Sequence, residues 1–198
     1  MDYVYNTYCM LNMLLDKGSS YMSKQELIDY QTTKRIFGKN TSGPGVLYDL
    51  TYKATKFFNR IFLGNAYNAR NFYELEKQNV GLIINCSNDI PHYFQDLFEY
   101  RRVAVQDKLR ENISPYLNSL ADDIHNYLEN NPNKNILIHC FMGSSRSATI
   151  LIAYIIKYKG YSRRDALNFL RDKRGLVNLN IDFFNQLGDF EEEIKTKL

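Results

Sequence analysis

The chain has 198 residues, of which 44% are hydrophobic and 24% charged, and its formal net charge is +3. This length fits one domain of about 100–200 residues with an extension, and the composition is that of a globular protein with a sizeable core. The low net charge argues against a nucleic-acid partner but suits an anionic substrate. No apolar run approaches the roughly 20 residues that cross a bilayer, and the first residues lack the pattern of a secretory signal. We therefore expect no membrane partner.

The chain contains three cysteines, Cys9, Cys86 and Cys140. Their odd number and wide spacing resemble neither a disulfide framework nor a zinc site. We therefore expect free thiols, no metal, and an intracellular, reducing compartment such as the cytoplasm.

Residues 1–56 are expected to form an N-terminal extension that is helical in part, ahead of a main domain at residues 57–198. Residues 8–15 are apolar and predict a short helix that stops near Gly18. Ser23 and Glu26 resemble a capping box that opens a second short helix.

From residue 57 onward, strand and helix patterns alternate along the chain. Strands are expected at residues 57–63, 81–86, 102–105 and 136–138. Helices are expected at residues 66–75, 114–128, 147–157, 162–175 and 183–194, with Ser114 and Ser162 as N-terminal caps. This alternation predicts an α/β fold in which helices flank a mainly parallel central sheet.

A loop that begins at Cys140 joins the buried strand at residues 136–138 to the apolar helix at residues 147–157. Ligands in open α/β sheets bind beyond the carboxyl ends of the strands, which is where Cys140 lies. The helix N-terminus supplies unpaired N–H groups and a positive dipole end, which favour an anion such as phosphate. Gly143 lets the backbone curl around that anion, and the planar fork of Arg146 can bind two phosphate oxygens.

The same field favours the thiolate form of Cys140. A free thiol has a pKa of about 8.5, which a helix N-terminus or a nearby cation lowers to ~3.5–7.5. A thiolate can attack phosphorus and form a phosphocysteine intermediate, which divides hydrolysis into two steps. The loop therefore predicts a hydrolase of phosphate monoesters with Cys140 as its nucleophile, rather than a buried structural cysteine.

The pattern His139-Cys140, five residues, then Arg146-Ser147 is similar to the active-site motif of the cysteine-dependent protein tyrosine phosphatase superfamily. Residues 140–149 and 151–154 resemble the dual-specificity phosphatases in particular. The similarity extends over about residues 57–194 and includes the segments 59–64, 80–85, 165–167 and 183–187. It implies a protein tyrosine phosphatase-like fold, a dual-specificity phosphatase catalytic domain at residues 57–198, and no cofactor.

The resemblance also implies a general acid on a separate loop. Asp107 lies at the matching position, where it would protonate the leaving oxygen and later deprotonate the hydrolytic water. Glu99 and Glu111 are the competing acids. Ser147 is expected to hydrogen-bond the sulfur of Cys140, and His139 is expected to orient the loop from behind. The residues expected to bind the substrate phosphate are Phe141, Met142, Gly143, Ser144, Ser145 and Arg146.

Two further positions carry hypotheses that come from the same resemblance. Some relatives have a second cysteine on the matching strand, so Cys86 is a possible redox partner that would trap oxidised Cys140 as a disulfide. Cys86 also fits a strand position that takes a small residue. Leu179 stands where the family often has Pro before the residue that matches Asn180, which affects loop stiffness rather than chemistry.

The implied function is hydrolysis of phosphotyrosine and of phosphoserine or phosphothreonine in phosphoprotein substrates. RNA 5′-phosphates and phosphoinositides are alternative substrates, and the uncharged loop argues against them. A basic rim would favour them, and its candidates are Arg101, Arg102, Arg163 and Arg164. A pseudophosphatase that only binds phosphoproteins is a further alternative, disfavoured because the nucleophile, the arginine and the acid are all present.

Two predictions concern assembly and source. The apolar helix at residues 8–15 packs on the domain or mediates a homodimer. The bias toward Asn, Lys, Ile and Tyr, with 16 Tyr and no Trp, is typical of AT-rich coding as in some large DNA viruses. A viral source would place the protein in the host cytoplasm or the virion.

Overall fold

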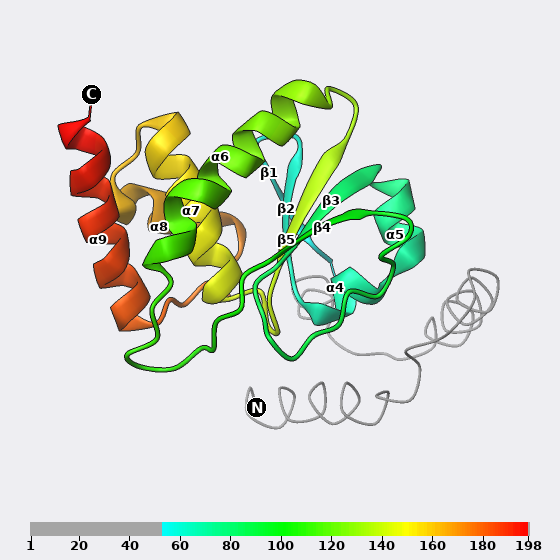
Figure 1. The fold of residues 1–198 in the computed structure, drawn as a ribbon, viewed down its shortest axis with the longest axis horizontal. Helices are drawn as coiled ribbons and strands as arrows, with labels where there is room; N and C mark the ends of the chain where they lie inside the picture. Colours follow the sequence, from blue (N-terminus) through cyan, green and yellow to red (C-terminus); the bar gives the residue numbers. More distant parts are fainter. Residues whose placement is uncertain (1–52, 198) are drawn as a thin grey trace. The chain divides into compact units, whose positions relative to one another are not determined.

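The computed structural model describes residues 53–197, which contain a five-stranded sheet with the strand order β1-β2-β5-β3-β4 (Figure 1). The four strands from β2 to β4 pair in parallel, and β1 adds an antiparallel edge. The expected mainly parallel sheet is therefore confirmed. The strands are β1 (Thr55–Phe57), β2 (Ile61–Gly64), β3 (Val80–Asn85), β4 (Glu99–Arg102) and β5 (Asn135–His139).

Helices cover both faces of the sheet, and α6 to α9 lie on the opposite side from α4 and α5 (Figure 1). The alternation of side chains along β5 shows why. Ile136 and Ile138 belong to the larger core with α6, α7 and α9, whereas Leu137 belongs to a smaller core with Ala69 and Leu75. The helices are α4 (Ala66–Arg70), α5 (Phe72–Lys77), α6 (Ser114–Asn130), α7 (Arg146–Lys159), α8 (Arg163–Lys173) and α9 (Ile181–Thr196).

Helix α7 is the centre of the larger core. All residues from 146 to 156 are buried, as its apolar character on every side predicts. The helix ends at Gly160, which has the left-handed φ of 70° that suits a glycine at a helix end. Because α7 is buried in the core, its N-terminus is fixed against the carboxyl end of β5. Within residues 53–197, no helix is both long and apolar enough to cross a membrane.

The single strand predicted at residues 57–63 is wrong, because this segment is a hairpin. Phe58 and Asn59 have positive φ angles of 46° and 65°, and they reverse the chain between β1 and β2. The apolar run on both sides of Asn59 concealed the turn. The predicted domain boundary at residue 57 falls inside β1, and the division into an extension and a catalytic domain stays a prediction.

Three other boundaries also differ from their predictions. The helix expected at residues 66–75 is divided at Asn71, which ends α4 and whose side chain caps α5 by accepting from Glu74 N–H. The strand expected at residues 102–105 lies instead at Glu99–Arg102. Ser114 is the first residue of α6 rather than its cap, whereas Ser162 caps α8 as predicted by accepting from Asp165 N–H. The predictions for Cys9, the helix at residues 8–15, Gly18, Ser23 and Glu26 lie outside the described residues.

Candidate active site

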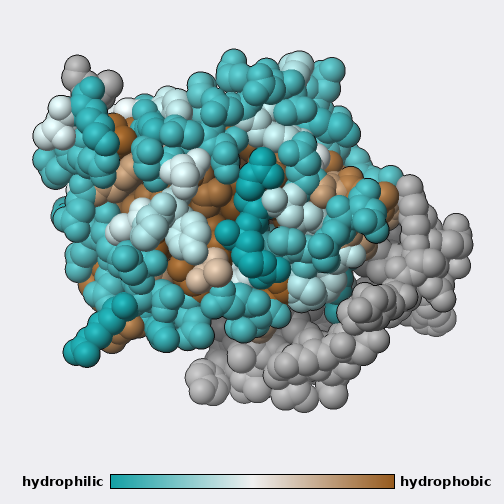
Figure 2. Space-filling view, viewed as in Figure 1, coloured by the Kyte–Doolittle hydropathy of each residue, from teal (hydrophilic) through white to brown (hydrophobic). Residues whose placement is uncertain are grey.

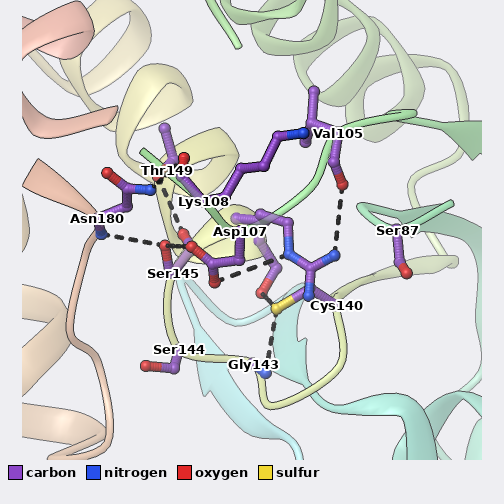
Figure 3. Close-up of polar contacts among 12 residues, drawn as sticks. Ser87, Val105, Asp107, Lys108, Cys140, Gly143, Ser144, Ser145, Thr149 and Asn180 are labelled. Carbon is purple, nitrogen blue, oxygen red and sulfur yellow. Dashed lines mark hydrogen bonds and ion pairs between the residues drawn. The ribbon is translucent and has the colours of Figure 1, made fainter. Parts of the chain in front are cut away.

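The loop of residues 140–146, called the phosphate loop below, leaves the carboxyl end of β5 and enters α7 (Figure 3). Strand β5 lies in the middle of the sheet between β2 and β3. The loop therefore lies at the position where open α/β sheets bind ligands, with the N-terminus of a long buried helix behind it.

Gly143 gives the phosphate loop its curvature. Its φ is +69°, and a Cβ there would lie 2.3 Å from Gly64 O, so a side chain is excluded by both conformation and space. The Gly143 N–H donates to Cys140 Sγ at 3.2 Å. A backbone donor is thus already aimed at the atom that is expected to carry the negative charge.

Cys140 is 1% exposed, and its sulfur accepts two hydrogen bonds. The second comes from the Ser147 hydroxyl, also at 3.2 Å, as predicted from the sequence. Two donors on one sulfur, at the N-terminus of α7, can stabilise negative charge that the sulfur carries during a reaction. The arrangement suits a nucleophile in the first step of a hydrolysis and a leaving group in the second.

Arg146 brings a buried cation to the mouth of the phosphate loop. Its side chain is 10% exposed, and its Nη1 donates to Val105 O at 3.4 Å. Its Nε lies 3.8 Å from Asp107 Oδ2 and has no hydrogen-bond acceptor. A buried donor without an acceptor costs free energy unless a ligand pairs with it. An oxyanion bound in the loop would accept a hydrogen bond from Arg146 Nε.

Asp107 lies on the loop that follows β4, and it is the predicted acid that contacts the phosphate loop. The Ser145 hydroxyl donates to Asp107 Oδ1 at 2.9 Å. The competing acids pair elsewhere: Glu111 lies 3.7 Å from Lys108, and Glu99 lies 3.9 Å from Arg101. The Asp107 side chain is 35% exposed, which leaves room for a substrate oxygen to approach it.

His139 lies under the phosphate loop and is fully buried. Burial lowers its pKa to about 3, and nearby charges on His92, Arg102 and Arg146 act in the same direction. The imidazole is therefore neutral at physiological pH. Its backbone oxygen accepts from Cys86 N–H at 2.7 Å. Its burial behind the loop keeps the imidazole away from a substrate, and its role in orienting the loop stays a prediction.

Cys86 follows Asn85, which pairs with His139 in the β3–β5 register, so Cys86 lies one position beyond this pair, beside Cys140. Both cysteines are buried free thiols in the same core cluster. Burial raises the pKa of Cys86 well above its usual value, and Cys140 raises it further. The sheet register thus places Cys86 and Cys140 at neighbouring positions, each directly after a paired residue of β3 or β5, and its raised pKa keeps the Cys86 thiol protonated.

The remaining predicted loop residues have different surroundings. Phe141 and Met142 are partly exposed, and Phe141 O accepts from Ala66 N–H at 3.2 Å. Ser144 Oγ donates to Leu176 O at 2.7 Å, and Figure 3 shows this hydroxyl turned away from Cys140. Ser144 therefore offers its backbone rather than its hydroxyl to an anion.

Most of the arginines that were candidates for a basic rim have other partners. Arg102 donates to the backbone oxygens of residues 87, 88 and 90, and Arg101 pairs with Asp123 at 3.3 Å. Arg163 donates to Phe184 O at 3.0 Å and stacks over that ring. Three of the four arginines thus make structural contacts.

Sequence reasoning missed Arg174, which holds the phosphate loop from behind. The residue is 0% exposed, and its Nε and Nη2 donate to Gly143 O at 3.0 Å and Met142 O at 3.3 Å. Burial lowers the pKa of Arg174, while the negative charge of Cys140 raises it. Arg174 was missed because a basic residue at the end of a helix is already explained by its favourable interaction with the helix dipole.

Residues 106–111, which include Asp107, are called the acid loop below. Sequence reasoning also missed that side chains of α9 and its N-cap hold this loop. Asn180 Nδ2 donates to Lys108 O at 2.7 Å, and Gln186 Nε2 donates to Glu111 O at 2.9 Å. Asn180 N–H also donates to Ser145 Oγ at 3.1 Å. The start of α9 therefore connects the acid loop with the phosphate loop. Within residues 53–197, no cluster of three or more His, Cys, Asp or Glu could hold a metal ion.

Comparisons with known proteins agree with this geometry. A family model described as "Dual specificity phosphatase, catalytic domain" matches residues 61–193. Protein phosphatase Slingshot of Drosophila melanogaster is 36% identical over 135 residues, which cover 67% of this chain and 12% of that protein. Dual specificity protein phosphatase 14 of Mus musculus is 33% identical over 134 residues, which cover 68% of this chain and 67% of that protein.

A solved structure gives the same result for the fold. The human tyrosine phosphatase-like serine/threonine/tyrosine-interacting protein has a TM-score of 0.67 and 29% identity, over 72% of this chain and 97% of that one. The expected protein tyrosine phosphatase-like fold is thereby confirmed.

A buried thiol at the end of a central parallel strand, with an arginine and a carboxylate at its mouth, defines the class of cysteine-dependent phosphatases. The chain belongs to the dual-specificity phosphatase family, as its resemblance predicted. The matched region spans two thirds of one relative and about an eighth of another. Activity, substrates and partners are therefore proposed separately below.

Proposed function

We propose that the protein hydrolyses phosphotyrosine and phosphoserine or phosphothreonine in phosphoprotein substrates through a phosphocysteine intermediate. The observation that carries this proposal is the pair of donors on Cys140 Sγ, both at 3.2 Å. A sulfur that is hydrogen-bonded twice and lies beside a buried arginine is prepared for negative charge. A structural cysteine needs neither feature.

In the first step, the Cys140 thiolate attacks phosphorus and the bond to the substrate oxygen breaks. Arg146 and the backbone N–H groups of the phosphate loop bind the phosphoryl oxygens as their charge is redistributed. The departing oxygen of tyrosine, serine or threonine takes the proton of Asp107. The products are a free hydroxyl group and phosphocysteine.

In the second step, water attacks the phosphorus of phosphocysteine while Asp107 accepts a proton from that water. The bond between phosphorus and sulfur breaks, and the electron pair returns to Cys140. The Ser147 hydroxyl stabilises the departing sulfur through the hydrogen bond that it already makes. Inorganic phosphate is released and the thiolate is restored.

The alternative substrates have less support. RNA 5′-phosphates and phosphoinositides bring additional negative charge, but Phe141, Met142, Ser144 and Ser145 are uncharged. Arg101 and Arg102 are engaged in structural contacts. The pseudophosphatase alternative is disfavoured because Cys140, Arg146 and Asp107 are all present and adjacent.

Hydrolysis of para-nitrophenyl phosphate tests the activity, and a panel of phosphotyrosine and phosphothreonine peptides tests dual specificity. We expect turnover by the wild-type protein and a loss of at least about 10⁴-fold in kcat for Cys140→Ser. An inactive wild-type protein, or an active Cys140→Ser variant, contradicts the proposal. Hydrolysis of phosphotyrosine alone would restrict it to tyrosine.

The proposal includes Cys86 as a protective redox partner. Peroxide oxidises the Cys140 thiolate to sulfenic acid, and the Cys86 thiol displaces water from it to form a disulfide. Mass spectrometry after mild peroxide treatment should detect a Cys86–Cys140 crosslink, with Cys86→Ser as the control. Over-oxidised Cys140 without a crosslink in the wild-type protein excludes this role.

Location and assembly remain predictions from the sequence. A reducing compartment such as the cytoplasm suits a nucleophilic thiol, and a viral source rests on composition alone. The homodimer prediction concerns residues 8–15, and light scattering of a protein lacking residues 1–20 tests it. An unchanged oligomeric state excludes that helix as the dimer contact.

A further inference from the structure

Two large apolar residues beside the active site are exposed to solvent. Leu109 is 65% exposed and Ile181 is 59% exposed, more than any other large apolar residue among residues 53–197. On the face shown in Figure 2, apolar residues are visible between hydrophilic ones, near the centre and toward the edges. A single exposed leucine is ordinary on a protein surface, so the position of this pair is what matters.

Hydrogen bonds on both sides hold the two residues next to each other. Asn180 Nδ2 donates to Lys108 O at 2.7 Å, and Arg110 N–H donates to Asp182 Oδ2 at 2.6 Å. The first bond joins the residues before Leu109 and Ile181, and the second joins the residues after them. The acid loop and the start of α9 therefore run side by side at this pair.

The pair lies beside the proposed general acid. Leu109 is two residues from Asp107, a separation of at most about 7 Å along the chain. Ile181 follows Asn180, whose N–H donates to Ser145 Oγ, and that hydroxyl donates to Asp107. Both apolar residues thus lie on the side of the site where the leaving group of the substrate must be.

We propose that Leu109 and Ile181 form an apolar lip that binds an apolar side chain of the phosphoprotein substrate, one or two positions from the phosphorylated residue. An extended peptide advances about 3.3 Å per residue, so these neighbours fall within reach of the lip. Covering the side chains of the lip with such a residue removes their apolar surface from water, which is favourable. The inference rests on the proposed function and adds a sequence preference to it.

The lip adjoins the active site, and this position indicates that the phosphoprotein substrate is what covers it. A phosphoprotein bound for hydrolysis must place its chain over the rim at Asp107, whatever else the protein binds. Lys108 and Arg110 flank Leu109, and Lys108 is paired with Glu111 at 3.7 Å, so part of the local positive charge is already balanced. An apolar neighbour therefore fits this rim better than an acidic one.

The test uses phosphotyrosine peptides that differ only by Leu, Ser or Glu at one position from −2 to +2. Binding is measured by fluorescence anisotropy on the Cys140→Ser protein, which does not depend on turnover. We expect Leu to bind about tenfold more tightly than Ser at one position. The added substitutions Leu109→Ser and Ile181→Ser should bring this ratio close to one.

Leu97→Ser is the matched control, added to the same Cys140→Ser protein. Leu97 is 52% exposed and lines a separate pocket with Phe72 and Val80, at the opposite end of the strands from Cys140. This variant should keep the Leu/Ser ratio. Each ratio compares peptides on one protein sample, so partial unfolding does not alter it, and Leu109→Ala provides a milder second variant.

The outcomes separate this inference from the proposed function. Equal binding of Leu and Ser peptides at every position, a stronger preference for Glu, or a ratio unchanged by the lip substitutions would overturn the lip. Loss of self-association in the lip variants, with the peptide ratio unchanged, would assign the surface to a second copy instead. An inactive wild-type protein toward para-nitrophenyl phosphate would overturn the proposed function, while the binding ratios still decide the lip.

Discussion

The phosphate loop and the acid loop meet at one site, but they are held in different ways. The phosphate loop is mostly buried, is bounded by β5 and α7, and is backed by the charge of Arg174. The acid loop is exposed from residue 106 to residue 110, and side chains of α9 hold its backbone. One loop is therefore part of the core, and the other is attached to the surface.

This difference matches the two tasks that the reaction sets. Binding an anion requires several N–H groups to converge on one point, and small displacements weaken that convergence. Moving a proton requires one carboxyl group within hydrogen-bond reach. The acid loop can therefore tolerate exposed residues such as Leu109 that adapt it to a substrate, whereas the phosphate loop cannot.

After the loss of the nucleophile itself, the largest expected effect comes from the acid loop. Asp107→Asn removes the proposed proton donor, and we expect kcat to fall by about 10²–10⁴-fold. The loss should be greater for phenyl phosphate than for para-nitrophenyl phosphate, because the better leaving group needs less protonation. Steady-state kinetics with both esters measures this difference.

Glu111→Gln is the control for that prediction, because Glu111 is the competing acid and pairs with Lys108 instead. It should leave the ratio between the two esters close to that of the wild-type protein. If Glu111→Gln widens the gap between the esters and Asp107→Asn does not, the acid has been assigned to the wrong residue.

The second prediction concerns the support behind the phosphate loop. Arg174→Met leaves Gly143 O and Met142 O without a charged donor, which costs about 2–3 kcal/mol of stability. We expect the inhibition constant of inorganic phosphate to rise about tenfold, because the loop N–H groups no longer converge. Urea unfolding and competitive inhibition measure the two effects.

Arg171→Met is the matched control on the same helix, since Arg171 donates to Val177 O at 3.1 Å rather than to the phosphate loop. Both variants should lose some stability, but only Arg174→Met should weaken phosphate inhibition. Equal inhibition constants in the two variants would show that Arg174 acts only in folding.

The phosphate loop could be predicted from the sequence because its determinants are local. A buried strand, a cysteine, a glycine, an arginine and a buried helix follow one another within about 20 residues. Asp107 could be placed because the resemblance supplied its spacing. Neighbouring residues in the chain specify the geometry only for the phosphate loop.

The supports could not be predicted, because they are tertiary contacts. Arg174 is 31 residues from Gly143, and Gln186 is 73 residues from Ile113. No local pattern indicates that α8 returns behind the phosphate loop or that α9 holds the start of α6. The turn at Phe58 and Asn59 was missed for a different reason, since two left-handed residues lie within an apolar run.

The third prediction concerns the pH dependence of stability that comes from the histidine behind the phosphate loop. His139, behind the phosphate loop, has a pKa of about 3 in the folded protein against 6.5 unfolded. The unfolded state therefore binds more protons, so stability is fully present above pH 6.5 and is lost as the pH falls toward 3. Between pH 6.5 and 5 we expect a loss of about 1.5 kcal/mol, measured by urea unfolding.

His139→Gln should remove most of this pH dependence. Burial also lowers the pKa of His92, but His92→Gln should change the slope less, because that shift is smaller. The window lies above the pH range in which two carboxyl groups with lowered pKa values reduce the stability. Lys157 lowers the pKa of Asp122, and the backbone N–H of Arg163, with Lys195, lowers that of Glu191. A slope that persists in His139→Gln would place the acid sensitivity elsewhere.

The smallest expected effect comes from Gln186, which couples the end of the acid loop to α6. Its Oε1 accepts from Ile113 N–H at 2.8 Å and Ser114 N–H at 3.0 Å, in place of the missing side-chain cap, and its Nε2 donates to Glu111 O. Gln186→Leu should cost about 1–2 kcal/mol of stability and reduce kcat for phenyl phosphate a few-fold. Gln186→Glu keeps both cap bonds and loses only the donor, so it should retain most of the stability but not the rate.

Phosphate inhibition should change in neither variant, because the phosphate loop does not depend on this anchor. A change in phosphate inhibition as large as the change in rate would show that the two loops are not supported independently.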